Sequence, residues 1–196
     1  MKKLLLLACF AFVSLLSTAQ NINLKKYLGT YQLENAPVSK IEVYLENGKL
    51  IGSGDGGNTT SLDATDKPDV FSLSAHSGSV TFTKNANGII IGLELMFNGE
   101  TFVGKRPEPQ PADYQGNYEM SGAPFDVLTV SVQGGVLQAT APGVGQGPLD
   151  WTVVYDEFYE SNNGATLVFK RDTNGSVQGV TILVQGMELN GKKQNK

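Results

Sequence analysis

The first candidate for acid–base chemistry is His76, the single histidine of the 196-residue chain. An imidazole can act as a general base, but His76 stands in the run Ser74-Ala75-His76-Ser77-Gly78, whose small residues are typical of a loop. Zinc sites use several histidine and cysteine ligands, and the chain has one histidine and one cysteine, Cys9, so a zinc site of nitrogen and sulfur ligands is excluded. We interpret His76 as an exposed loop residue without a catalytic role.

Carboxylates offer two further kinds of site. Asp55, Asp63, Asp66 and Asp69 lie in and after a glycine-rich stretch and carry the hard oxygen ligands that calcium prefers. Their spacing fits no calcium-binding loop, and aspartates at strand ends often bond their own backbone in turns. We therefore expect no metal site and no cofactor.

A pair of carboxylates facing each other across a cleft could cleave a glycosidic bond, and the candidates are Glu42, Glu46, Glu157 and Glu160. Glu42 and Glu46 share a face of one expected strand, which favours a solvated surface over a catalytic pair. An enzyme with an unrecognised carboxylate site remains the alternative from a different functional class.

Activated nucleophiles are absent as sequence motifs. After the N-terminal segment no serine is followed by lysine three positions later, and no Gly-x-Ser-x-Gly elbow occurs. The glycine runs at 52–57 and 143–147 lack the Gly-Lys-Ser/Thr ending of a phosphate-binding loop. The sequence therefore predicts no catalytic residues.

Aromatic side chains gather in the second half of the chain, at Trp151, Tyr155, Phe158 and Tyr159. Such a group could line a pocket for an apolar ligand or a sugar, because binding pockets are mostly apolar with few polar groups. We favour the interpretation that Trp151 fills the core where its counterpart in the first half, Ala64, is small.

The elements that must position these residues are strands and tight turns. Ile41, Val43 and Leu45 alternate with Glu42, Tyr44 and Glu46, the period-two pattern of a strand with one buried face. Asn47-Gly48, Asn87-Gly88 and Asn98-Gly99 each favour the positive φ angles of a hairpin turn. Returning strands are expected at 49–53, 70–74, 79–83, 89–97 and 101–103, with a glycine-rich connection over 52–58.

This pattern occurs twice. Residues 27–106 match residues 114–193 at 22 of 80 positions with a constant offset of 87 and no gap. The matches begin with the Tyr-x-Gly-x-Tyr stretches Tyr27 to Tyr31 and Tyr114 to Tyr118, whose tyrosines we expect to share a strand face and close a core. A period this long indicates a duplicated domain and not a solenoid array.

The duplication sets the expected domain boundaries. Residues 20–106 form the first β unit, 107–113 a proline-rich linker and 114–196 the second β unit. The alternating prolines of 107–111 favour an extended conformation that would reach about 15 Å at roughly 3.1 Å per residue.

The N-terminal 19 residues have the charged, apolar and small-residue order of a secretory signal peptide, with cleavage expected after Ala19. A membrane anchor is the competing interpretation, but the apolar run from Leu4 to Leu16 is short for a bilayer. A lipoprotein signal at Cys9 would leave four leucines as its apolar region. We expect an exported protein, periplasmic or secreted, that does not span a membrane after cleavage.

Cleavage would leave 13 basic and 19 acidic residues, a net charge of −6, and no cysteine. Such a chain cannot form disulfides and depends on its hydrophobic core. Because phosphate binding needs concentrated lysine and arginine, the acidic balance argues against a nucleic-acid partner.

The order Tyr-x-Gly-x-Tyr, alternating strand, Gly-x-Leu and then Phe-x-x-Asp-x-Asn-Gly-x-Val-x-Gly-Val from Phe169 to Val180 resembles a known family. It is similar to the lipocalin-like domain of unknown function found C-terminal to serine hydrolases of the penicillin-binding-protein and class C β-lactamase type. The resemblance implies a small antiparallel barrel or strongly curved sheet per copy and an accessory role. The Ser-x-x-Lys motif of the hydrolase is missing here, so the resemblance carries over the fold and not the activity.

We therefore expect an all-β protein of two tandem antiparallel lipocalin-like units and no catalysis. The expected role is binding, of a small apolar molecule in a barrel or of a protein partner through strand edges and loops. The alternative is a structural accessory that assembles with a separate serine hydrolase.

Overall fold

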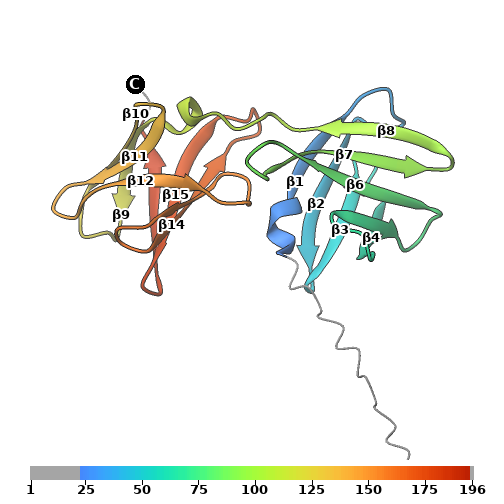
Figure 1. Ribbon diagram of the computed structural model, residues 1–196, viewed down its shortest axis with the longest axis horizontal. Coiled ribbons are helices and arrows are strands. Elements are labelled where there is room, and N and C mark those ends of the chain that lie inside the picture. Colours follow the sequence, from blue (N-terminus) through green and yellow to red (C-terminus); the bar gives the residue numbers. More distant parts are fainter. Residues whose placement is uncertain (1–22, 195–196) are drawn as a thin grey trace, which may run out of the picture.

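The computed structural model describes residues 23–194, which form two closed eight-stranded antiparallel β-barrels in tandem (Figure 1). The first barrel consists of β1 (Gly29–Leu33), β2 (Lys40–Glu46), β3 (Lys49–Gly54), β4 (Thr59–Ala64), β5 (Val70–Leu73), β6 (Gly78–Lys84), β7 (Ile90–Phe97) and β8 (Glu100–Lys105). The second consists of β9 (Gly116–Ser121), β10 (Val127–Gln133), β11 (Val136–Ala141), β12 (Gly145–Trp151), β13 (Glu157–Glu160), β14 (Ala165–Arg171), β15 (Val177–Val184) and β16 (Met187–Lys193). This confirms the all-β class and selects closed barrels over open curved sheets.

Each strand pairs with its neighbours in sequence, and the first strand of each barrel pairs with the last. In the first barrel this closure is short, with Gln32 opposite Lys105 and Leu33 opposite Gly104. In the second, β9 and β16 pair over four residues, from Ser121–Asn190 to Tyr118–Lys193. Among the described residues every strand therefore has a partner on both sides, which disfavours the expected docking of a protein along an exposed edge. Docking of a protein partner on the loops, the other part of that expectation, stays a prediction.

The predicted tight turns form where expected. Asn47 and Gly48 connect β2 to β3 with φ angles of 50° and 76°, the positive values of a type I′ hairpin. Asn98 and Gly99 do the same between β7 and β8. The turn at Asn87-Gly88 lies within a longer loop, residues 85–89, which the Asn85 side chain stabilises by accepting from the amides of Asn87 and Ile89.

One strand was missed. The glycine-rich stretch 52–58 was expected to be a connection, but its first three residues belong to β3 and are followed by a turn and β4. Gly52 and Gly54 pair with Thr60 and Ile41 respectively. Glycine is depleted in strands, so Gly52 and Gly54 masked the continuation of β3.

A short 3-10 helix precedes each barrel: η1 (Leu24–Tyr27) and η2 (Pro111–Tyr114). The first tyrosine of each Tyr-x-Gly-x-Tyr stretch therefore ends a helix, and the expectation that both tyrosines share a strand is wrong. Both are nonetheless core residues, as predicted, with Tyr27, Tyr31, Tyr114 and Tyr118 at most 1% exposed. The expected linker 107–113 is shorter than predicted, because Pro111 already begins η2.

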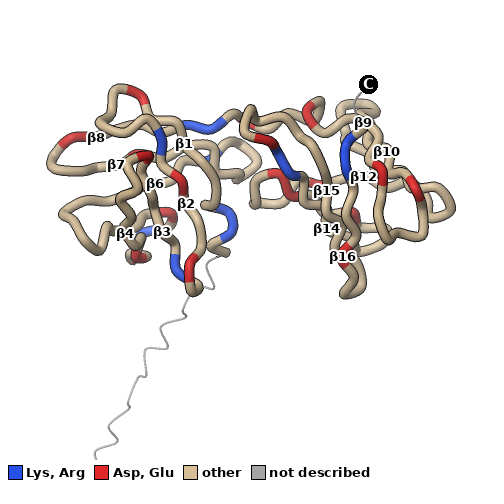
Figure 2. Tube along the Cα trace, turned by 180° about the vertical axis from the view of Figure 1, so that it is seen from behind, with Lys and Arg blue, Asp and Glu red and all other residues tan. Residues whose placement is uncertain are grey.

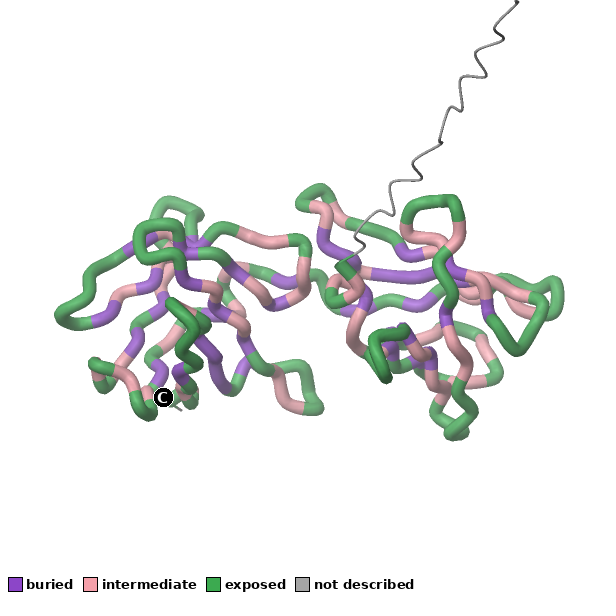
Figure 3. The backbone as a smooth tube through the Cα atoms, turned by 90° about the horizontal axis from the view of Figure 1, so that it is seen from below, coloured by how far each residue is buried: buried purple, intermediate pink, exposed green. Residues whose placement is uncertain are grey.

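Inward-facing positions alternate with exposed ones along the strands, and the exposed segments gather in the loops at the barrel ends (Figure 3). Ile41 and Val43 are buried as expected, whereas Leu45 is 37% exposed because it lies near the end of β2. Acidic and basic positions are interspersed along both barrels (Figure 2).

Within residues 23–194 no helix has the length and apolar character needed to cross a bilayer. The expected signal peptide, residues 1–19, lies outside the described residues.

Candidate functional site

The two ends of each barrel differ. The closed end of the first barrel is where η1 lies and where β2–β3, β4–β5 and β6–β7 connect. At its open end lie the loops at 34–39, 55–58, 74–77 and 98–99. Adding 87 to these residue numbers gives the corresponding loops at the open and closed ends of the second barrel.

The open end of the first barrel contains a cavity of about 490 Å³. Its walls are mostly aliphatic and aromatic, and its rim carries hydroxyl, amide and imidazole groups. The lining residues are Ala36, Pro37, Val38, Ile41, Val43, Gly52, Ser53, Gly54, Asn58, Thr59, Thr60, Leu62, Leu73, His76, Val80, Leu93, Leu95, Phe97 and Phe102.

Small residues keep this cavity open. A β-carbon at Gly52 would lie 3.6 Å from a methyl group of Leu62, and one at Gly54 would lie 3.3 Å from Cγ1 of Val38. Both glycines have ordinary φ angles, so their role is to leave space and not to permit a turn.

The corresponding cavity of the second barrel measures about 90 Å³. There Ala139 and Ala141 occupy the positions of Gly52 and Gly54, and Phe125 replaces Val38. Phe125 packs against the core of the second barrel. The duplicated fold thus carries one roomy mouth and one nearly filled mouth.

His76 lies at the rim of the roomy mouth and is exposed, as predicted. Its ring meets the ring of Phe97 edge-on with 5.3 Å between centroids. An imidazole in this position can contact the polar end of a molecule whose apolar part is inside the barrel.

The closed end of the first barrel is sealed by aromatic rings and an ion-pair network. The Tyr27 ring packs edge-on against Phe71 with 4.8 Å between centroids and in a tilted arrangement against Phe82 with 4.6 Å. The Tyr31 hydroxyl donates to the carbonyl of Tyr27 at 2.8 Å. Burial raises the pKa of Tyr31 to about 12.

Asp69, one of the proposed calcium ligands, anchors this seal. Its carboxylate accepts from the Tyr27 hydroxyl at 2.7 Å and forms ion pairs with Lys26 at 2.7 Å and Lys84 at 2.5 Å. Burial alone would raise the pKa of Asp69, but these three donors outweigh it and lower the pKa to about 2.

Arg106 ties the last strand of the first barrel to η1. Its guanidinium donates to three carbonyl oxygens, those of Ile90 at 2.7 Å, Leu28 at 2.7 Å and Lys26 at 3.4 Å. The side chain is buried, and this burial lowers the pKa of Arg106. Sequence reasoning did not single out Arg106, which is not among the matched positions because its counterpart is Lys193.

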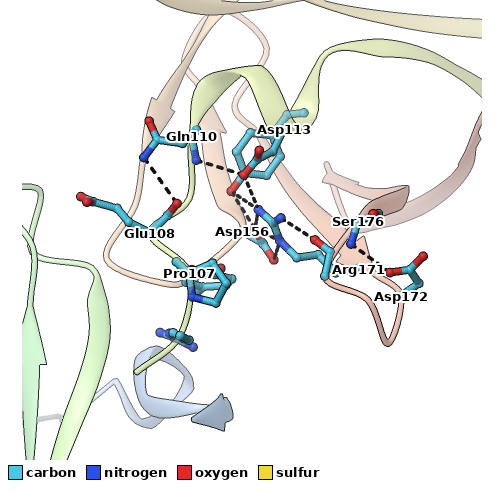
Figure 4. A network of polar contacts seen from close by, with 12 residues as sticks. Pro107, Glu108, Gln110, Asp113, Asp156, Arg171, Asp172 and Ser176 are labelled. Carbon is cyan, nitrogen blue, oxygen red and sulfur yellow. Dashed lines mark hydrogen bonds and ion pairs between the residues drawn. The ribbon is translucent and has the colours of Figure 1, made fainter. Parts of the chain in front are cut away.

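The second barrel closes in a similar way with different charges (Figure 4). Arg171 contacts Asp156 at 2.9 Å and Asp113 at 3.2 Å, while the Tyr114 hydroxyl donates to Asp156 at 2.6 Å. Burial alone would lower the pKa of Arg171, but the Asp156 carboxylate raises it. Asp113 takes the position of Lys26, so the sign of that charge is reversed between the copies.

The four aromatic residues considered as a possible ligand pocket do not form one. Trp151 packs on Phe158 at 4.3 Å and on Tyr114 at 5.7 Å, within the core of the second barrel. Tyr159 is 44% exposed, and Tyr155 reaches the linker. The favoured interpretation of Trp151 as a core filler is the one the structure supports.

The carboxylate candidates are likewise dispersed. Asp55 accepts from the backbone and side chain of Ser39 near the open end, and these hydrogen bonds lower the pKa of Asp55. Asp69 lies at the opposite, closed end. Among residues 23–194 no three His, Cys, Asp or Glu side chains gather in a way that could hold a metal ion.

A search against protein-family models finds no match to the chain, and a search against curated proteins finds none either.

Proposed function

We propose that this protein is an exported, non-catalytic binding protein that holds a small apolar ligand in the open end of its first barrel. The observation that carries the proposal is the cavity of about 490 Å³ lined by Leu62, Leu93, Phe97 and similar side chains. Pockets for small ligands are concave, mostly apolar, and about 300–1,000 Å³ in volume.

The comparison between copies supports a role for this space. The second barrel folds with its open end nearly filled by Phe125, Ala139 and Ala141. An open apolar cavity forfeits packing contacts that a filled core would gain. Retaining Val38, Gly52 and Gly54 therefore favours a ligand as the occupant of the first barrel.

The rim suggests how a ligand would be oriented. Asn58, Thr60 and His76 offer hydrogen-bonding groups above aliphatic walls. A molecule with an apolar body and one polar end would fit this arrangement. Among the described residues that line the cavity, His76 is the one titratable side chain, which supports binding in preference to acid–base catalysis.

The eight-stranded antiparallel topology of both barrels supports the proposed relationship to the lipocalin-like domain of serine hydrolases. The N-terminal sequence supports export to the periplasm or the medium. Fractionation of the producing cells, with mass determination of the N-terminus, tests export; a full-length chain in the cytoplasm would contradict it.

Native mass spectrometry of the chain purified gently from its own host tests ligand binding. We expect an additional mass that is lost on denaturation. A heavier complex containing another polypeptide would redirect the assignment to a protein partner.

A triple variant, Val38→Phe with Gly52→Ala and Gly54→Ala, tests the location. These are the residues that the second barrel carries at the same positions. We expect at least a tenfold loss of binding of the co-purified ligand or of a neutral apolar dye, with both barrels folded. Met96→Ala, on the exposed face of the same barrel, is the matched control. Undiminished binding in the triple variant would contradict the proposal.

A further inference from the structure

A buried carboxylate lies in the small mouth of the second barrel. Glu160, the last residue of β13, is 4% exposed and lines the cavity of about 90 Å³ together with apolar side chains such as Leu167 and Ile182. The corresponding residue of the first barrel is Leu73. The two mouths therefore differ in chemistry as well as in size.

Several neighbouring residues differ between the copies in a way that accommodates this carboxylate. Gly147 stands where the first barrel has Thr60, and a β-carbon at position 147 would collide with Oε1 of Glu160. Asn162 and Asn163 replace Ala75 and His76. A glycine thus makes the space that the carboxylate occupies, and two asparagines hold it there.

The hydrogen bonds to the Glu160 carboxylate come from neutral donors. Oε1 accepts from the backbone amide of Asn162 at 2.9 Å, and Oε2 accepts from the backbone amide of Asn163 at 3.0 Å and from its side chain at 2.8 Å. Within the described part of the chain, no ion pair involves Glu160. A buried charge with neutral partners alone is unfavourable compared with a paired one.

The turn beside Glu160 does not by itself require a carboxylate. The first barrel makes a turn of the same length at 74–77 with Leu73 at the corresponding position, where the amide of His76 donates to the Leu73 carbonyl. The charge is therefore an addition to the duplicated unit and not a condition for its folding.

We infer that the mouth of the second barrel is a separate binding site for a small cationic group, an alkylammonium, which pairs with Glu160. The walls supplied by Leu128, Ala139 and Leu167 suit a short alkyl chain, and the cavity has room for few non-hydrogen atoms. This site does not depend on the ligand proposed for the first barrel, since it is formed by different residues in the other copy.

Two probes of equal length separate charge recognition from simple apolar filling. The mature protein, with methyl groups of Leu128, Leu167 and Ile182 followed by NMR, is titrated with butylammonium and with 1-butanol. We expect butylammonium to saturate the shifts of the second barrel at a concentration at least tenfold lower than butanol. In the first barrel, methyl groups of Val80 and Leu93 report whether the preference is confined to the second mouth.

Glu160→Gln keeps the shape and removes the charge, and should abolish the preference for butylammonium. Glu157→Gln, a carboxylate on the same strand that does not line the cavity, is the matched control and should retain it. Equal affinity for both probes in the unaltered protein, or an undiminished preference in Glu160→Gln, would overturn the inference. The comparison in the unaltered protein decides the question even if Glu160→Gln fails to fold.

Discussion

At the scale of single residues, Asp69 shows how a carboxylate that looked like a metal ligand instead stabilises a barrel end. Its pKa is lowered to about 2 by Tyr27, Lys26 and Lys84 despite burial. A carboxyl group whose pKa is lower in the folded state stabilises above its unfolded pKa and loses that contribution as pH falls through the folded value. The contribution of Asp69 should therefore be complete at pH 5 and disappear between about pH 4 and 2.

Asp69→Asn tests this expectation. The variant should be less stable to urea than the unaltered protein at pH 5, and the difference should shrink as the pH is lowered toward 2. Asp63→Asn changes the same charge at an exposed position and serves as the control. A difference in unfolding free energy that stays constant from pH 5 to 2 would contradict the assigned role of Asp69.

The paired glycines Gly29 and Gly116 allow a second comparison at this scale. Their φ angles are 132° and 145°, which disfavour other residues, so alanine at either position should destabilise its barrel by about 1–3 kcal/mol. The loss should be larger for Gly29→Ala. A β-carbon there would lie 2.8 Å from Nη1 of Arg106, which is fixed by three carbonyls, whereas at Gly116 it would meet the flexible Lys193 chain at 2.9 Å.

Thermal and urea unfolding of the two alanine variants measure this order. Gly134→Ala provides a reference for a positive-φ glycine whose β-carbon would meet nothing within 4 Å. Unchanged unfolding in both Gly29→Ala and Gly116→Ala would remove the evidence that the repeated stretch builds a repeated core.

At the scale of elements, Arg106 links η1, β7 and the end of β8. Its planar guanidinium reaches the carbonyls of Lys26, Leu28 and Ile90 at once, which a lysine ammonium cannot reproduce with the same geometry. Arg106→Lys should destabilise the first barrel by about 2–4 kcal/mol, because buried carbonyls lose charged donors.

Hydrogen exchange provides the measurement for Arg106→Lys. We expect faster exchange in η1 and at the start of β7, with the second barrel unchanged. Lys193→Arg, at the corresponding position of the second barrel, is the matched control and should leave exchange in the first barrel unaltered. Faster exchange spread evenly over both barrels would contradict a local role for Arg106.

The elements that the sequence predicted are those with a strong local signal. Asn47-Gly48 and the alternation around Val43 depend on backbone geometry and burial within one hairpin, and both are present. β4 was missed, since Thr59 to Ser61 carry no large apolar residue opposite the open cavity. Arg106 was missed because its partners are up to 80 residues away.

The residues of the candidate site could not be predicted from the sequence. The sequence named no ligand-binding residues: the favoured interpretation of Trp151 was a core filler, which its packing bears out, and the cavity lies in the other barrel. The difference between Val38 and Phe125 is visible in the sequence, yet its meaning depends on knowing that both side chains face the barrel mouth. That requires the three-dimensional pairing of strands far apart in the chain.

At the scale of the whole molecule, the two barrels meet through their closed ends. Tyr155, in the loop between β12 and β13, places its ring 4.0 Å from the Arg106 guanidinium of the first barrel and 5.6 Å from that of Arg171 in the second. Its hydroxyl donates to the carbonyl of Pro107 at 2.9 Å. The loops of the two open ends consequently lie away from this contact, toward the outer sides of the molecule (Figure 1).

Tyr155 is specific to the contact between barrels, since its counterpart in the first copy is Pro68. A guanidinium stacked on a desolvated tyrosine contributes about 0.5–2 kcal/mol. Tyr155→Ala should therefore loosen the relative orientation of the barrels without unfolding either one. Tyr155→Phe keeps the ring over Arg106 and should retain most of the coupling.

Small-angle scattering and calorimetry together test this coupling. For Tyr155→Ala we expect a broader distribution of inter-barrel distances and two unfolding transitions that lie further apart than in the unaltered protein. Tyr159→Ala removes an exposed tyrosine from the outer face of the second barrel and controls for general destabilisation. If Tyr155→Ala leaves scattering and both transitions unchanged, the linker and η2 fix the orientation without the arginine–tyrosine stack. If it broadens the distances as expected, a cation and an aromatic ring hold two independently closed barrels in one arrangement.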